Sequence, residues 1–155
     1  MSVRLYMKHF ILSGLLVAAT AVTAVADTIA LNSGRTMVGR IGVGPNIGGA
    51  CSLVVTSTEQ DLFSPRHQVT FSLLKIVNKK WVAARAESFS MQNYSSGDLF
   101  GSKIVANKNG EQKKITATLF LDQQTQTYKV ILHEAKLVSD GSTGKFIVCE
   151  RMVLR

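Results

Sequence analysis

Apolar and polar residues alternate most regularly between residues 113 and 136. In each half of this stretch every second residue is apolar, and a short polar segment joins the two halves. The apolar positions are Ile115, Ala117, Leu119, Leu121, Tyr128, Val130 and Leu132. A period of two on both sides of a short connection predicts an antiparallel β-hairpin with one buried face.

Similar apolar runs lie on both sides of this hairpin and are separated by turn-forming residues. They predict strands at residues 36–43, 50–57, 67–77, 80–91, 103–106 and 145–154. Asn78-Lys79 and Asn109-Gly110 are predicted to close tight hairpins. A change of apolar parity at Leu74 predicts a bulge or a strand buried on both faces. The last strand has apolar residues at both parities and is expected to be buried on both sides.

Eight or nine short strands at hairpin spacing, without an amphipathic helix of 10 or more residues, predict an all-β domain. Successive hairpins form a small antiparallel meander, and a closed barrel removes its exposed edges most simply. A two-sheet β-sandwich is the alternative, because the same strand pattern is compatible with it.

Residues 1–26 have the layout of a cleaved secretory signal peptide. A basic start precedes an apolar run at residues 10–25, and Ala24-Val25-Ala26 supplies a small-x-small cleavage site. The run is shorter than the roughly 20 residues that a membrane-spanning helix needs. We therefore expect an exported protein, periplasmic or extracellular, with one β-barrel-like domain at residues 27–155 and no transmembrane segment in the mature chain.

The mature chain is basic. Without Arg4 and Lys8, 16 of the 18 lysines and arginines remain against 10 acidic residues, which gives a charge of about +6. Such a balance predicts weak contact with anionic polymers of the cell envelope. The basic residues are scattered and no nucleic-acid-binding module is visible, so we expect no specific binding to nucleic acid.

Cys51 and Cys149 are the two cysteines of the chain. An even number of cysteines in an exported protein predicts a disulfide. Both lie in predicted strands, so the bond would join an early strand to the last one. The bond would close a loop of nearly a hundred residues. For a loop of that length the chain-entropy model gives a stabilisation of roughly 4–5 kcal/mol.

Metal and nucleotide sites are not predicted. The glycine-rich segment 44–49 matches neither the P-loop nor the dinucleotide-binding fingerprint, so it is expected to be a turn. His133 and Glu134 are consecutive on a strand, so they point to opposite faces and cannot bind one ion together. His67 lies at a strand start and is expected to be solvated. We expect neither a metal nor a cofactor.

Catalytic residues are not evident in the sequence, which favours a non-catalytic protein over an enzyme. Glu87 follows Arg85 by two residues, so the two share one strand face. They are expected to form a surface pair, unless that face lines a barrel interior. A small secreted enzyme that uses Glu87, His133 or Glu134 in a cavity is the third alternative.

Binding is the predicted function. Small barrels place variable loops at a rim and can leave a small cavity. We expect a ligand in the barrel mouth, or a protein partner at loops 44–49, 59–66 and 92–102, as for a secreted inhibitor. The candidate binding residues are Phe63, Arg66, Tyr94 and Phe100. A structural or assembly component of the cell envelope is the alternative.

Overall fold

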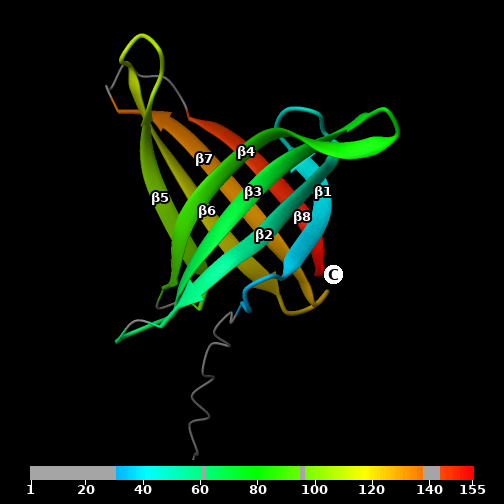
Figure 1. The fold of residues 1–155 in the computed structure, drawn as a ribbon, viewed down its shortest axis with the longest axis vertical. Helices are drawn as coiled ribbons and strands as arrows, with labels where there is room; N and C mark the ends of the chain where they lie inside the picture. The colour runs from blue at the N-terminus through cyan, green and yellow to red at the C-terminus, as the bar shows by residue number, and fades with distance from the viewer. Residues whose placement is uncertain (1–30, 61, 95–96, 138–143) are drawn as a thin grey trace, which may run out of the picture.

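The alternating runs fold as eight antiparallel strands that close into one barrel in chain order (Figure 1). The computed structural model describes residues 31–60, 62–94, 97–137 and 144–155, and the predicted signal peptide lies outside them. The strands are β1 (Thr36–Val43), β2 (Ala50–Glu59), β3 (Arg66–Val77), β4 (Lys80–Asn93), β5 (Leu99–Ala106), β6 (Gln112–Asp122), β7 (Thr127–Lys136) and β8 (Lys145–Leu154). β1 pairs with β8, which closes the barrel. The predicted all-β meander is confirmed, and the two-sheet sandwich is wrong.

Successive turns lie at opposite ends of the barrel (Figure 1). The turns after β1, β3, β5 and β7, with the strand residues next to them, form what we call the basic end. The turns after β2, β4 and β6, with the start of β1 and the end of β8, form what we call the aromatic end. The predicted loops 59–66 and 92–102 lie at the aromatic end, whereas 44–49 lies at the basic end.

The lumen of the barrel is the hydrophobic core, because every second residue of each strand points inward. The buried apolar residues of the described chain are Leu31, Met37, Ile41, Cys51, Leu53, Val55, Val69, Phe71, Leu73, Phe89, Met91, Leu99, Ile115, Ala117, Leu119, Val130, Leu132, Ile147, Cys149 and Met152. The hairpin of β6 and β7 has the predicted parity, with Ala117 opposite Leu132 and Leu119 opposite Val130.

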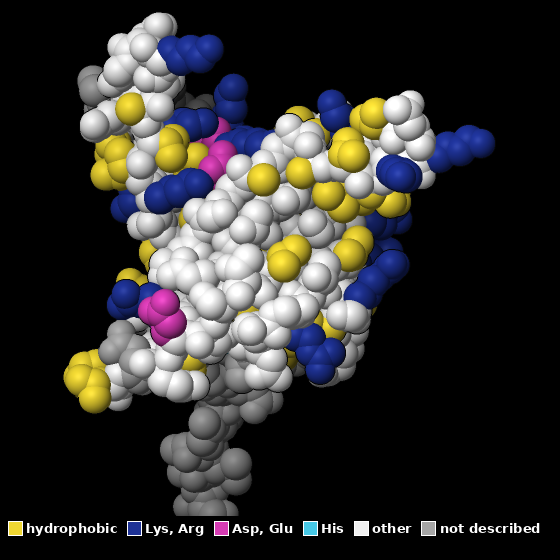
Figure 2. All heavy atoms as spheres, viewed as in Figure 1, with side chains coloured by type: hydrophobic (Ala, Val, Ile, Leu, Met, Phe, Trp, Pro, Cys, Tyr) yellow, Lys and Arg dark blue, Asp and Glu magenta, His cyan; other side chains and the backbone are white. Residues whose placement is uncertain are grey.

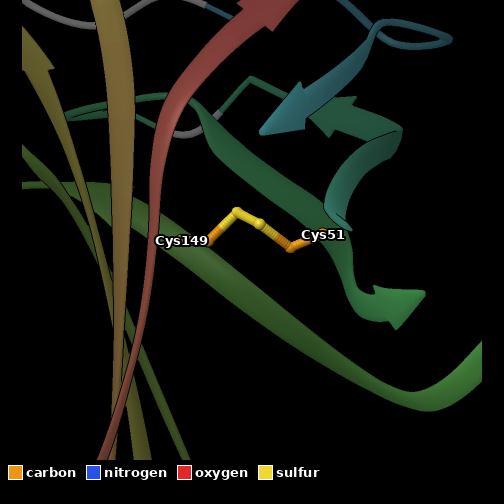
Figure 3. The surroundings of a disulfide bond; sticks show 2 residues. All are labelled: Cys51 and Cys149. Carbon is orange, nitrogen blue, oxygen red and sulfur yellow. A yellow bond between two sulfur atoms is a disulfide. The ribbon is translucent and has the colours of Figure 1, made fainter. Parts of the chain in front are cut away.

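The predicted disulfide between Cys51 of β2 and Cys149 of β8 is present inside the lumen (Figure 3). It joins the two strands that flank β1, with a Cα–Cα distance of 6.2 Å and a sequence separation of 98. Gly39 of β1 pairs with Cys51, and a Cβ at Gly39 would lie 2.6 Å from the carbonyl oxygen of Glu150. A disulfide is typical of oxidising compartments, which is consistent with the predicted export.

β8 differs from its prediction, because it is buried on one face only. Arg151 has a φ of 52°, and the register with β7 shifts between Tyr128 and Val130. Because of this bulge, the next inward residue after Cys149 is Met152. The other apolar residues near the strand's end are left exposed. Apolar residues at both parities therefore marked a bulge rather than burial on two faces.

Two loops at the aromatic end are shorter than predicted. β2 continues through Glu59, β4 continues through Asn93, and β5 begins at Leu99. Leu99, inside the predicted loop 92–102, is a strand residue that is fully buried in the lumen. Strand pairing extends these segments beyond the apolar runs that are visible in the sequence.

The barrel wall has its fewest paired residues between β4 and β5. Two residue pairs join these strands, both next to the aromatic end, whereas twelve join β3 to β4. Beyond a bulge at Leu73 and Leu74, β3 and β4 continue as a two-stranded hairpin that projects from the basic end (Figure 1). Its turn residues Asn78 and Lys79 have φ values of 51° and 63°, as a tight hairpin requires.

Candidate functional site

An ionic layer lines the inner wall of the barrel at the basic end. It consists of Arg85 and Glu87 on β4, Lys103 on β5, Lys113 on β6 and Glu134 on β7. Each continues the inward parity of its strand beyond the buried apolar residues. The predicted surface pair of Arg85 and Glu87 therefore faces the mouth of the barrel, because closure turns that strand face inward. Figure 2 shows basic and acidic side chains gathered at this end, between β5 and β4.

Arg85 is at the centre of the layer. Its Nη2 donates to Glu87 Oε1 at 2.9 Å and also to Glu134 Oε1, which lies across the lumen on β7. Lys113 Nζ donates to Glu134 Oε2 at 3.2 Å. Lys103 Nζ forms an ion pair with Glu87 Oε2, and this pair bridges β4 and β5. Side-chain ion pairs thus join β4 to the rest of the barrel where strand pairing with β5 has ended.

The network keeps both glutamates ionised. Burial by itself would raise the pKa of Glu87 and of Glu134, but the hydrogen bonds from the surrounding cations outweigh it and lower both pKa values. Burial alone would lower the pKa of Arg85, yet its two carboxylate partners raise it. The two glutamates are therefore charged at neutral pH and are poor proton acceptors.

Two pockets open beside the ionic layer and share Glu134 and Lys145. The larger has a volume of about 480 Å³ and includes Arg85 among its charged residues. Its apolar lining residues are Val43, Pro45, Phe146 and Ile147. The smaller has a volume of about 340 Å³ and lies between the turn after β5 and the facing ends of β7 and β8. Cations and apolar surface therefore meet in one cavity.

Lys145 differs from the cations of the ionic layer. Arg85, Lys103 and Lys113 each bind a glutamate, whereas Lys145 has no carboxylate partner within the described ranges. The larger pocket thus contains two cations, Arg85 and Lys145, and one carboxylate, that of Glu134. An uncompensated positive charge remains in the pocket.

The four binding residues predicted from the sequence lie at the aromatic end, away from these pockets. Phe63 is 97% exposed in the turn after β2, and Arg66 begins β3. Tyr94 and Phe100 form an edge-to-face contact with ring centroids 5.4 Å apart. Their role in binding stays a prediction. The sequence predicted a ligand in a barrel mouth but did not identify the residues that line it, although charged residues two positions beyond an inward leucine or phenylalanine were a usable signal.

The histidines do not join the ionic layer. His67 is buried rather than solvated, since its Nδ1 lies 3.0 Å from Thr58 Oγ1, and burial lowers its pKa. His133 stacks on Phe146 with ring centroids 4.4 Å apart, on the strand face opposite to Glu134. In the part of the chain that the structure describes, no three histidine, cysteine, aspartate or glutamate residues are grouped to hold a metal ion.

Among residues 31–60, 62–94, 97–137 and 144–155, no helix has the length and apolar character needed to cross a membrane. No known protein family, curated protein or solved structure matches the chain. The interpretation of the site therefore depends on the residues of the barrel mouth and on their chemistry.

Proposed function

We propose that this protein is a non-catalytic binding protein that holds a small organic anion in the barrel mouth at the basic end. The observation that carries the proposal is Lys145, an uncompensated cation in a pocket that also contains Arg85 and apolar walls. An anionic group of a ligand would pair with Lys145, and its apolar body would pack on Val43 and Ile147.

The volume of the mouth limits the size of the ligand. A pocket of about 480 Å³ is in the lower part of the range of small-molecule sites, roughly 300–1,000 Å³. The lumen below it is occupied by buried side chains and the disulfide. The ligand would therefore sit in the mouth and not deep inside the barrel.

The ionic layer supports binding rather than catalysis. Glu87 and Glu134 both contact Arg85, but each is held as a carboxylate by two cations. A general base or acid works best when its pKa lies near the operating pH, and these pKa values are lowered. His133, the third residue of the enzymatic alternative, lies on the opposite strand face.

A structural or assembly role in the cell envelope is the second candidate, and the basic surface supports it. Such a protein would be retained on anionic envelope polymers through many weak contacts. Because exposed charges are screened by salt, this retention would disappear at high ionic strength. A ligand held in the partly enclosed mouth would remain bound under the same conditions.

Calorimetric titration of the oxidised protein tests the proposal, with benzoate and hexanoate as probes and their neutral amides as controls. We expect the carboxylates to bind and the amides to fail. A charge-assisted hydrogen bond contributes about 1.5–3 kcal/mol, so Lys145→Gln should weaken binding roughly tenfold or more. Lys129→Gln, at an exposed lysine near the aromatic end of β7, is the matched control. Equal binding by both variants would contradict the proposal, as would equal binding of acids and amides.

A further inference from the structure

The tip of the β3–β4 hairpin, residues 75–82, exposes apolar side chains beyond the barrel. Ile76 is 62% exposed and Trp81 57%, while Val77 is 41% and Val82 38% exposed. Figure 2 shows apolar side chains on this projection with basic side chains around them. A hairpin whose large apolar residues remain outside the core is a candidate contact surface.

The apolar side chains occupy both faces of the hairpin tip. Ile76 pairs with Trp81 and shares one face with it. Val77 and Val82 lie at the alternate positions and therefore on the other face. A docked protein would cover one face of a two-stranded ribbon, whereas a lipid interface would surround the tip and cover both.

The charge of the tip indicates which kind of partner surface it would contact. Lys75, Lys79 and Lys80 lie within it, and the sequence has no acidic residue from 75 to 86. Pairing with the same tip of a second copy would place three lysines against three, which is unfavourable. Lysines around tryptophan and aliphatic side chains suit the interface of an anionic bilayer.

We propose that the basic end docks on anionic lipid surfaces, with the hairpin tip inserted among the headgroups. The lysines would attract the anionic leaflet, while Trp81 and Ile76 would enter its interfacial region. This inference goes beyond the proposed ligand site, because it concerns residues 75–82 and none of the mouth residues. Failure of one proposal therefore leaves the other standing.

Trp81 is the single tryptophan of the chain, so its fluorescence reports on the tip directly. The oxidised protein is mixed with vesicles of equimolar phosphatidylglycerol and phosphatidylcholine, or of phosphatidylcholine alone. We expect a blue shift of the emission, protection from iodide quenching and co-sedimentation with the anionic vesicles. An unchanged spectrum with anionic vesicles would overturn the proposal, as would an equal response to phosphatidylcholine alone.

Variants separate the contributions of charge and apolar contact. Lysines near an anionic surface contribute about 1 kcal/mol each, so Lys79→Gln with Lys80→Gln should weaken vesicle binding by roughly 30-fold. Ile76→Ser should reduce the blue shift. Phe63→Ser is the matched control, because it removes an exposed apolar side chain at the opposite end. These residues are exposed, and unchanged thermal unfolding would verify that each variant folds.

Three other results would count against the proposal. Loss of vesicle binding in Phe63→Ser but not in Ile76→Ser would assign the contact to the aromatic end. A blue shift that depends on protein concentration and occurs without vesicles would identify a second copy of the chain as the occupant of the tip. A protein partner would be indicated if soluble envelope proteins, and not vesicles, shifted the emission.

Discussion

The two ends of the barrel share one architecture but differ in their inward-facing residues. At the aromatic end the inward positions next to the turns include Leu99, Leu119 and His67, all of them buried. At the basic end the same parity carries the five charged residues of the ionic layer, and two pockets open beside them. Apolar inward residues seal a small barrel, whereas charged ones keep its mouth hydrated and open.

The distribution of charged residues between the two ends follows the same division. In the described residues the basic end has ten lysines or arginines against three glutamates, and the rest of the barrel has six against four acidic residues. The cations of the basic end are Lys75, Lys79, Lys80, Arg85, Lys103, Lys108, Lys113, Lys114, Lys136 and Lys145. The excess positive charge is thus concentrated at the end with the pockets and the projecting hairpin. This end is therefore the one suited to anionic partners.

The largest expected effect comes from removing the disulfide, which lies inside the lumen that both ends share. Replacing Cys51 and Cys149 together by alanine removes the disulfide from the lumen. The chain-entropy model predicts a loss of roughly 4–5 kcal/mol in the free energy of unfolding. Denaturant unfolding of the variant and of the oxidised protein measures it. An unchanged midpoint would mean that the bond does not constrain the unfolded chain as proposed.

The next effect should be confined to the basic end. Arg85→Met leaves Glu87 and Glu134 without their shared partner, and hydrogen bonds to charged groups contribute about 1.5–3 kcal/mol. We expect a loss of roughly 2 kcal/mol in the free energy of unfolding and faster amide exchange along β4 near Glu87. Arg35→Gln, at an exposed arginine near the aromatic end, should change stability by less than about 0.5 kcal/mol. Equal losses in the two variants would show that the ionic layer does not hold β4.

Acidification should affect His67 at the aromatic end and the ionic layer at the basic end in different pH ranges. The pKa of His67 is lowered from 6.5 by burial, so the unfolded chain gains a proton first and stability falls as the pH drops below 6.5. The pKa values of Glu87 and Glu134 are lowered from 4.5, so their stabilisation is complete above 4.5 and is lost as the pH falls through the folded values.

Denaturant unfolding over a pH series separates these two ranges. His67→Gln should remove the decrease that begins below 6.5 and retain the more acidic one. Glu134→Gln should retain the decrease below 6.5 and reduce the more acidic one, to which Glu87 still contributes. A single shared transition that neither substitution alters would contradict the assignment of separate pH responses to His67 and to the ionic layer.

The smallest effect should come from the aromatic end. Tyr94→Leu removes the edge-to-face contact with Phe100, and aromatic pairs contribute about 0.5–1.5 kcal/mol. Because Tyr94 is largely exposed, we expect a loss near 0.5 kcal/mol in the free energy of unfolding. A much larger loss would show that Tyr94 helps to seal the lumen.

Local patterns in the sequence predicted most of the fold. Period-two alternation defined the hairpin of β6 and β7, and Asn78-Lys79 and Asn109-Gly110 marked two turns that the structure contains. The parity change at Leu74 corresponds to the bulge between β3 and β4. These features depend on neighbouring residues, so they can be inferred before the barrel closes.

The candidate site could not be predicted in the same way, because it depends on closure. Arg85 and Glu87 shared a strand face in the sequence, but only pairing around the whole barrel turns that face toward Glu134 on β7. His67 was expected to be solvated because it follows a loop, and instead it packs inside the aromatic end. Inward parity shows which side of a strand a residue occupies. It does not show how far the lumen extends.

Backbone-amide chemical-shift mapping on addition of benzoate tests most directly whether the basic end is the binding end. We expect the shifted amides to cluster around Val43, Arg85, Glu134 and Lys145, with neutral benzamide producing no such cluster. Shifts centred on Phe63 and Tyr94, or equal shifts with benzoate and benzamide, would contradict it. A cluster at Val43, Arg85, Glu134 and Lys145 would assign binding to the mouth, whereas a cluster at Phe63 and Tyr94 would assign it to the loops of the aromatic end.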